Sequence, residues 1–187
     1  MLNEWKQKRD VINRYDRTAK TYDVQYSEEQ NAKIEVALED LRIDDEAVIL
    51  DAGCGTGILF SHIAKCARLV VGIDTSLNLL KQAKPKAKNY SNAAIVRADT
   101  DHEPFIAETF THAFAFTLLQ NIPNPAAALE EIKRATRLKA SLIVTGLKKH
   151  FTLEGFKLLI TSAQLEITSL RTNDRLKDYV ATCRKRL

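Results

Sequence analysis

The chain has 187 residues with a net charge of +4, and 45% of its residues are hydrophobic and 28% charged, a composition that is ordinary for a globular domain. No stretch approaches the roughly 20 apolar residues that a membrane span requires. The N-terminus also lacks the apolar run of a signal peptide, so we expect a cytoplasmic protein without a membrane span.

The positions of cysteine and histidine argue against a metal site. Cys54, Cys66 and Cys183 are widely separated and form no C-x-x-C pair, and the four histidines show no ligand spacing. We therefore expect free cysteines in a reducing compartment and no bound metal.

In chain order, the sequence predicts helices first and then an alternation of strands and helices. About the first 25 residues are expected to be helical, and the run at residues 14–26 contains Tyr15, Tyr22 and Tyr26. Apolar residues at helical spacing continue through residues 31–43. Five apolar runs then predict strands, at residues 47–53, 68–74, 93–99, 112–119 and 140–147.

Helices are predicted after the first, second and fourth of these strands. The inner face of the first helix is expected to consist of small and apolar residues, namely Leu59, Ile63, Cys66 and Ala67. Ser76 is a start signal for the second helix, and Pro125 suits the first turn of the third. Residues 152–164 predict one more helix, and residues 165–173 and 176–186 predict two strands near the edge of the sheet.

The five central strands are continuous apolar runs, as expected when helices cover both faces of a parallel sheet. We therefore predict an α/β fold, a doubly wound Rossmann-like sandwich with a mostly parallel seven-stranded sheet and an antiparallel edge strand. The whole chain, residues 1–187, is expected to form a single domain.

The turn after the first predicted strand reads "DAGCGTG", residues 51–57. A nucleoside triphosphate site would need a lysine directly after the glycines, but the next lysine is Lys65. A dinucleotide site would need a third small residue at position 58, which is Ile58, whereas the third glycine is Gly57. The first alternative fails, and a dinucleotide fits poorly.

The spacing D-x-G-x-G-x-G resembles motif I of the class I S-adenosylmethionine-dependent methyltransferases, and three further segments fit that resemblance. Asp74 ends the second predicted strand, where an acid would bind ribose hydroxyls. Residues 97–105, "RADTDHEPF", are similar to the third motif of the family. Residues 15–23, "YDRTAKTYD", resemble the opening of the methyltransferase type 11 subgroup, which includes ubiquinone and menaquinone pathway enzymes.

The resemblance implies S-adenosylmethionine as the cofactor. Gly53 and Gly55 would let the backbone approach the ligand, and Asp51 would accept from its ammonium group. Asp74 would take the ribose hydroxyls, and Asp99 with Thr100 would bind the adenine. The full set of implied cofactor-binding residues is Tyr22, Asp51, Gly53, Cys54, Gly55, Asp74, Thr75, Asp99, Thr100 and Thr117.

The methyl acceptor is expected near residues 117–121, at the end of the fourth strand. The following loop, "QNIPNP", lacks the [DN]-P-P-[YFW] motif of enzymes that methylate exocyclic adenine amines, and no cysteine nucleophile lies nearby, so DNA is not expected. Methylation at oxygen, nitrogen, sulfur or activated carbon remains open. The catalytic residues are unknown; Gln120 and Asn121 are candidates for orienting the acceptor, and His150 is a candidate base.

No insertion after the fifth central strand could form a lid, which leaves residues 1–30 as the lid segment. A thin lid and the basic tail at residues 183–187 slightly favour a macromolecular acceptor, RNA or protein, over a small molecule. A quinone-precursor-like small molecule is the alternative acceptor, and a non-catalytic cofactor-binding subunit is the alternative function. The resemblance also implies a partner for some members, a small zinc-ribbon activator protein.

Overall fold

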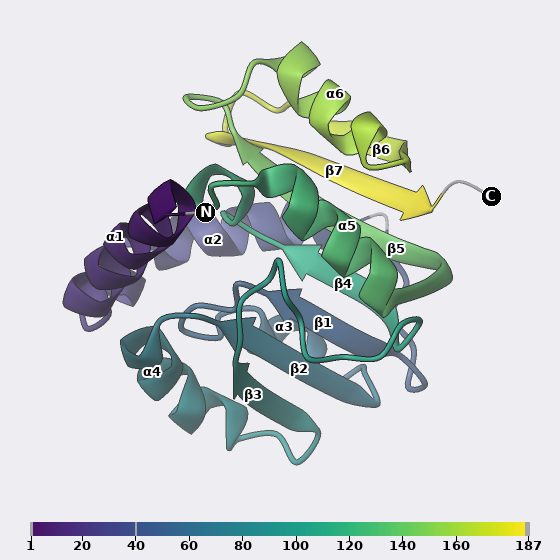
Figure 1. Cartoon of the computed structure of the whole chain (residues 1–187). Coiled ribbons are helices and arrows are strands. Elements are labelled where there is room, and N and C mark those ends of the chain that lie inside the picture. The colour runs from purple at the N-terminus through teal and green to yellow at the C-terminus, as the bar shows by residue number, and fades with distance from the viewer. Residues whose placement is uncertain (1, 40, 186–187) are drawn as a thin grey trace.

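The computed structural model describes residues 2–39 and 41–185. Its centre is one seven-stranded sheet in the order β3-β2-β1-β4-β5-β7-β6 (Figure 1). The strands are β1 (Val48–Ala52), β2 (Leu69–Asp74), β3 (Ala93–Arg97), β4 (Phe110–Ala115), β5 (Thr136–Leu147), β6 (Leu165–Arg171) and β7 (Asp178–Lys185). Strands β1 to β5 are parallel, whereas β7 runs antiparallel to β5 and to β6. The predicted doubly wound α/β fold with an antiparallel edge is confirmed.

Helices cover both faces of this sheet. They are α1 (Leu2–Thr18), α2 (Tyr22–Leu38), α3 (Phe60–Ile63), α4 (Leu77–Ala87), α5 (Pro125–Ala135) and α6 (Leu153–Ser162), with a 3-10 turn at Leu119–Asn121. Helices α5 and α6 pack on one face, and α2, α3 and α4 pack on the other. Figure 1 shows α5 in front of the sheet and α2 and α3 behind it. Within the described residues, no helix is both long and apolar enough to cross a membrane.

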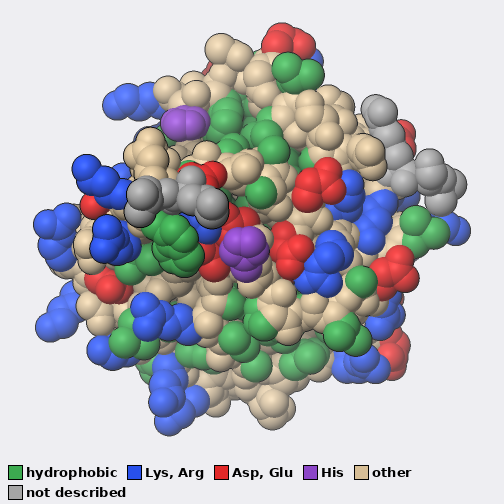
Figure 2. Space-filling model, viewed as in Figure 1, with side chains coloured by type: hydrophobic (Ala, Val, Ile, Leu, Met, Phe, Trp, Pro, Cys, Tyr) green, Lys and Arg blue, Asp and Glu red, His purple; other side chains and the backbone are tan. Residues whose placement is uncertain are grey.

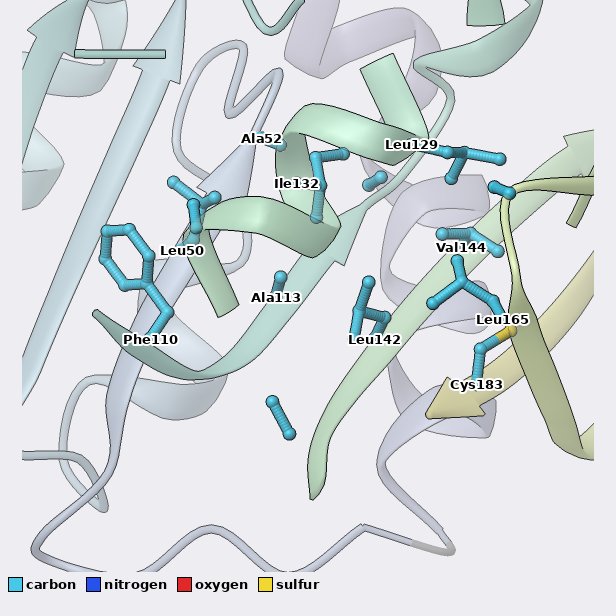
Figure 3. Packing of buried hydrophobic residues seen from close by; sticks show 14 of the residues in the cluster. Leu50, Ala52, Phe110, Ala113, Leu129, Ile132, Leu142, Val144, Leu165 and Cys183 are labelled. Carbon is cyan, nitrogen blue, oxygen red and sulfur yellow. The ribbon is translucent and has the colours of Figure 1, made fainter. Parts of the chain in front are cut away.

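On the face covered by α5 and α6, the core is formed by side chains from strands that are far apart in the sequence. Leu50, Ala113 and Leu142 come from three neighbouring strands and meet Leu129 and Ile132 of α5 (Figure 3). Because each of these side chains is less than 2% exposed, their burial contributes about 1.5–3 kcal/mol for each large apolar residue. This packing fixes the carboxyl ends of the central strands relative to one another.

Helix starts follow the predicted local signals. The Ser76 hydroxyl accepts from the backbone N–H of Leu79 at 3.1 Å and so caps α4. Asn124 caps α5 in the same way, and Pro125 occupies its first turn.

The helix after β1 corrects one expectation. The helix spans only Phe60–Ile63, so the predicted inner face does not continue. Leu59, Ile63 and Ala67 are buried as expected, but Cys66 is exposed, because the chain has left the helix before it reaches that residue.

Candidate active site

The candidate site lies beyond the carboxyl ends of β1 and β4, where the strand order reverses and α/β folds usually bind ligands. Three adjoining hollows open there. A central cavity contains Asp74, Asp99 and Asn121, and an inner pocket contains Asp51 and Cys54. An outer cleft contains Gln120, among other residues, and opens between α1, α2 and the ends of β5 and β7.

The glycine turn at residues 51–57 forms the floor between the central cavity and the inner pocket. Gly53, Gly55 and Gly57 have φ angles of +75°, +55° and +74°, a region that side chains other than glycine rarely adopt. A Cβ on Gly53 would lie 2.8 Å from Leu118 Cδ1, whereas a Cβ on Gly55 would meet no atom within 4 Å. The turn therefore leaves room at Gly55 for a ligand to lie against the backbone.

Asp74, at the end of β2, is held in a fixed orientation by backbone amides. Gly55 N–H donates to Asp74 Oδ2 at 2.9 Å, and Ser76 N–H donates to Oδ1 at 2.8 Å. Burial raises the pKa of Asp74, while these amide donors act in the opposite direction. The carboxylate also lines the central cavity, so it is a preoriented acceptor for hydroxyl groups of a ligand.

Asp51, in β1, is a buried carboxyl group whose Oδ2 atom has no hydrogen-bond partner within the described residues. Burial raises the pKa of Asp51 to about 8, and the nearby Asp74 carboxylate adds to the shift. Since Asp51 lines the inner pocket, a ligand ammonium group there would pair with the open acceptor position and favour the ionised form of the carboxyl group.

Asp99, just after β3, is bound by a lysine of the N-terminal helix. Lys8 Nζ donates to Asp99 Oδ2 at 2.7 Å and to Asp101 Oδ1 at 2.6 Å. Burial raises the pKa of Asp99, and Lys8 opposes that shift. Thr100 is buried beside it on the cavity wall. Lys8 thus ties α1 to the edge of the central cavity.

A strained residue lies two positions after the end of β4 and lines both the central cavity and the outer cleft. Thr117 has a φ angle of +55°, uncommon for a β-branched residue. Its Oγ1 atom accepts from Gln30 Nε2 at 3.0 Å and from Lys33 Nζ at 2.9 Å, and its amide donates to Thr145 Oγ1 at 2.8 Å. These contacts from α2 and β5 hold the strained backbone in place, which is characteristic of functional positions.

Tyr22 is shared by all three hollows. Its ring lies 6.1 Å from the ring of Tyr15 and 5.0 Å from that of Tyr26, measured between centroids. Burial raises the pKa values of Tyr15 and Tyr22, so both phenols are neutral hydrogen-bonding groups at neutral pH. Tyr22 therefore lies at the junction of the three hollows.

The structure brings together all ten residues that the resemblance assigned to the cofactor. The central cavity or the inner pocket is lined by Tyr22, Asp51, Gly53, Cys54, Gly55, Asp74, Thr75, Asp99, Thr100 and Thr117. Of the three catalytic candidates, Asn121 lines the central cavity and the outer cleft, and Gln120 lines the outer cleft. His150 is exposed, lines none of the three hollows, and packs edge-on against Phe151.

The sequence did not single out Lys8, Gln30 or Lys33, although each contacts a predicted site residue. A signal for Lys8 exists, because Lys8, Ile12 and Tyr15 are spaced at helical intervals of four and three residues and all line the central cavity. Gln30 and Lys33 carry no comparable signal, since they reach Thr117 only through the packing of α2.

Comparison with known proteins assigns this chain to a family. Residues 50–144 match the sequence model of a protein family that is described as "methyltransferase domain". An uncharacterised protein of Methanocaldococcus jannaschii is 33% identical over 131 residues, 70% of this chain and 49% of the relative. A demethylmenaquinone methyltransferase of Corynebacterium kroppenstedtii is 30% identical over 148 residues, 74% of this chain and 60% of the relative. The chain spans about half the length of the curated relatives it matches.

Among solved structures, a similar fold occurs in a complex between the Trm112 methyltransferase activator of Haloferax volcanii and a protein described there as a methyltransferase. The TM-score is 0.79 at 13% sequence identity, and the match covers 95% of this chain and 98% of that one. At this identity the likeness concerns the fold alone.

Proposed function

The chain belongs to the methyltransferase domain family, whose methyl donor is S-adenosylmethionine, and we propose that it methylates a small-molecule acceptor at oxygen, nitrogen, sulfur or activated carbon. One observation carries the proposal. Three carboxyl groups lie at or just beyond the ends of three adjacent parallel strands, namely Asp51, Asp74 and Asp99. They line the central cavity and the inner pocket, which adjoin each other at the glycine turn.

The cofactor has groups that match these carboxylates in kind. Asp51, which is buried and has one oxygen without a hydrogen-bond partner in the described part of the chain, would hold the ammonium of the amino-acid tail. Asp74 would accept from the ribose hydroxyls, while Asp99 and the backbone of Thr100 would bind the adenine edge. When bound, the cofactor supplies a methyl group on a positively charged sulfur. The junction residue Tyr22 and the strained Thr117 would then border the reacting atoms and exclude water from them.

The names of the similar proteins support a small-molecule acceptor. The sequence alone had instead favoured a macromolecular acceptor. The similar proteins include demethylmenaquinone methyltransferases and ubiquinone biosynthesis O-methyltransferases. The outer cleft adjoins the cofactor site through Tyr15, Tyr22, Thr117 and Asn121, so an acceptor bound there would reach the methyl group. We also propose that α1 and the start of α2 act as the lid, because Lys8 and Tyr15 line the central cavity from that side.

A macromolecular acceptor is the second candidate. On the face shown in Figure 2, Lys and Arg side chains gather at the left margin, where Figure 1 has α1 and α4. A basic surface of this kind attracts polyanions such as RNA. An activator partner is a further part of the proposal, supported by the fold shared with a methyltransferase that is described in complex with its activator.

We further propose that residues 1–187 form one domain, because segments from both halves of the chain share one sheet. A cytoplasmic location is also proposed, since Cys54, Cys66 and Cys183 are free, as in reducing compartments.

Calorimetric titration with S-adenosylmethionine and S-adenosylhomocysteine tests the cofactor site. Asp74→Ala should weaken binding at least about tenfold, because it removes a fixed carboxylate acceptor. Asp45→Ala, an exposed change far from the cavity, is the matched control. Transfer of labelled methyl groups to fractionated cell extract, with and without a co-expressed zinc-ribbon activator, then identifies the acceptor. Label in the small-molecule fraction supports the proposal, and label in RNA or protein replaces it.

A further inference from the structure

The outer cleft has a composition that indicates which acceptors it can bind. It adjoins the cofactor site at Tyr15, Tyr22, Thr117 and Asn121 and opens to solvent between Tyr26 and the ends of β5 and β7. The rest of its lining is polar or charged, apart from Leu147. The inference below rests on the proposed function, because it concerns the acceptor of that reaction.

One wall of the cleft is aromatic. Tyr15, Tyr22 and Tyr26 form a continuous row with centroid distances of 6.1 and 5.0 Å. Tyr26 is 43% exposed, so its ring is available to a ligand at the mouth. Such faces bind planar groups by stacking. Gln30 donates from Nε2 to the Tyr22 hydroxyl at 3.3 Å, which fixes the middle ring of the row.

The cleft also has an excess of positive charge in its lining. Arg14, Lys148, Lys149 and Lys177 line it against a single carboxylate, Glu29. Lys177 pairs with Glu29 at 2.5 Å, and Lys33 lies 3.5 Å from the same carboxylate. Among residues 2–39 and 41–185, no carboxylate forms an ion pair with the other three cleft cations. A cleft with this imbalance favours anionic ligands.

The inner end of the cleft contains an unsatisfied amide. Both side-chain polar atoms of Gln120, Oε1 and Nε2, are buried and have no hydrogen-bond partner within the described residues. A buried amide without partners is unfavourable, and a ligand with a hydroxyl or carbonyl group would supply the missing hydrogen bonds. Asn121, next to it, is already used, because its Nδ2 donates to Thr117 O at 2.7 Å and its Oδ1 accepts from Arg14.

We propose that the outer cleft binds a planar, anionic small molecule as the methyl acceptor. The planar part stacks on the tyrosine row, the negative charge faces Lys148 and Lys149 near the mouth, and a polar atom at the inner end bonds to Gln120. The cleft lining contains no histidine, and its one carboxylate is held by lysines, so the acceptor atom arrives already nucleophilic. That atom's electron pair forms the new bond to the methyl carbon, and the carbon–sulfur bond breaks with its pair left on sulfur.

The test uses the full chain saturated with S-adenosylhomocysteine and calorimetric titration with matched probes. The main probe is 6-hydroxy-2-naphthoate. Its neutral counterpart is 6-hydroxy-2-naphthamide, and its counterpart without the hydroxyl is 2-naphthoate. Failure of S-adenosylhomocysteine to bind would refute the proposed function itself, whereas a loaded protein that binds none of these acids refutes only the acceptor class.

The acid should bind at least about tenfold more tightly than the amide, and added salt should reduce that difference. Lys148→Met with Lys149→Met should weaken acid binding about two- to fivefold for each lysine, while S-adenosylhomocysteine binding stays unchanged. The matched control is Lys65→Met with Lys84→Met, at exposed positions outside the cleft lining. Gln120→Leu should weaken the hydroxylated acid but not 2-naphthoate.

Equal affinity for acid and amide, or equal acid binding by the lysine variant and its control, would overturn the proposal. Octauridylate serves as the competitor, because a row of aromatic rings beside lysines can also bind single-stranded RNA. Tighter binding of octauridylate than of the acid would overturn the small-molecule assignment.

Discussion

Lys33 of α2 and Asp178 at the start of β7 form a buried ion pair, with Nζ and Oδ2 2.8 Å apart and both side chains 1% exposed. The same ammonium donates to Thr117 Oγ1 at 2.9 Å. One lysine therefore joins the helix that covers the site, the antiparallel strand β7 and the strained Thr117 that follows β4. Since β7 enters the sheet beside β5, the pair couples the C-terminal strands to the candidate active site.

Lys33→Met should lower the free energy of unfolding by about 3–5 kcal/mol, because it leaves the Asp178 carboxylate buried without its partner. Urea denaturation measures the change. The double variant Lys33→Met with Asp178→Leu should lose less than the sum of the two single changes. Lys177→Met, at an exposed pair with Glu29, is the control and should leave the unfolding midpoint unchanged. A loss below about 1 kcal/mol for Lys33→Met would contradict the structural role.

The glycine turn should separate folding from binding. A Cβ on Gly57 would lie 3.0 Å from the Phe60 ring and 3.3 Å from Ala83 Cβ, so Gly57→Ala should destabilise the fold by about 1–3 kcal/mol. A Cβ on Gly55 meets nothing within 4 Å, so Gly55→Ala adds backbone strain but no clash. Its main effect should be a loss of S-adenosylhomocysteine affinity of at least about tenfold. Thermal unfolding and calorimetry on both variants check this, and a reversed pattern would refute it.

The sequence predicted those features of the fold and the site that depend on short segments of the chain. The spacing of residues 51–57, together with Asp74 and the segments 97–105 and 15–23, was enough to identify the family and the cofactor, because such motifs depend on local residue types. Ser76 and Pro125 predicted helix starts for the same reason. These features need only neighbours within a few residues.

Contacts between distant segments could not be predicted in this way. Lys33 and Asp178 are 145 positions apart, and neither lies in a recognisable motif. Cys66 was assigned to an inner helix face, but α3 ends at Ile63 and the residue is exposed. His150 was a candidate base because it follows β5, yet packing places it outside all three hollows. The ion pair, the exposure of Cys66 and the position of His150 all depend on how helices and strands pack against one another. The spacing of apolar residues along the sequence does not determine that packing.

Asp51 and Glu103 should make the stability of the cofactor-free protein fall as the pH rises. Burial raises the pKa of each to about 8, whereas the unfolded values are about 3.9 and 4.3. Between these limits the folded state keeps protons that the unfolded state has lost, so the unfolding free energy decreases from about pH 4 to 8. Urea titrations across this range measure the slope. Asp51→Asn and Glu103→Gln should each flatten it and be more stable than wild type at pH 8.

The same two variants should differ in ligand binding. Asp51 lines the inner pocket, whereas Glu103 lines none of the three hollows. Asp51→Asn should therefore reduce S-adenosylhomocysteine affinity about tenfold or more, because an amide cannot neutralise an ammonium group. Glu103→Gln should bind like wild type in the same calorimetric titration. Equal affinities for the two variants would exclude Asp51 as the ammonium partner.

Lys8 should act on cofactor binding through Asp99 and through the position of α1. Lys8→Met removes the contacts to Asp99 and Asp101, although Asp16 still accepts from the Asn78 amide at 3.0 Å and keeps α1 attached. Without Lys8, burial raises the pKa of Asp99 unopposed, so the group is protonated more readily as the pH falls.

We expect Lys8→Met to weaken S-adenosylhomocysteine binding about three- to tenfold, with a larger loss at pH 5.5 than at pH 8, because a protonated Asp99 is a poorer acceptor for an amine. Lys6→Met, an exposed change on the same helix, is the control in both titrations. If Lys8 only closes the site against the ligand, Lys8→Met would bind more tightly at both pH values. The sign of the change therefore distinguishes a lysine that orients Asp99 from one that competes for it.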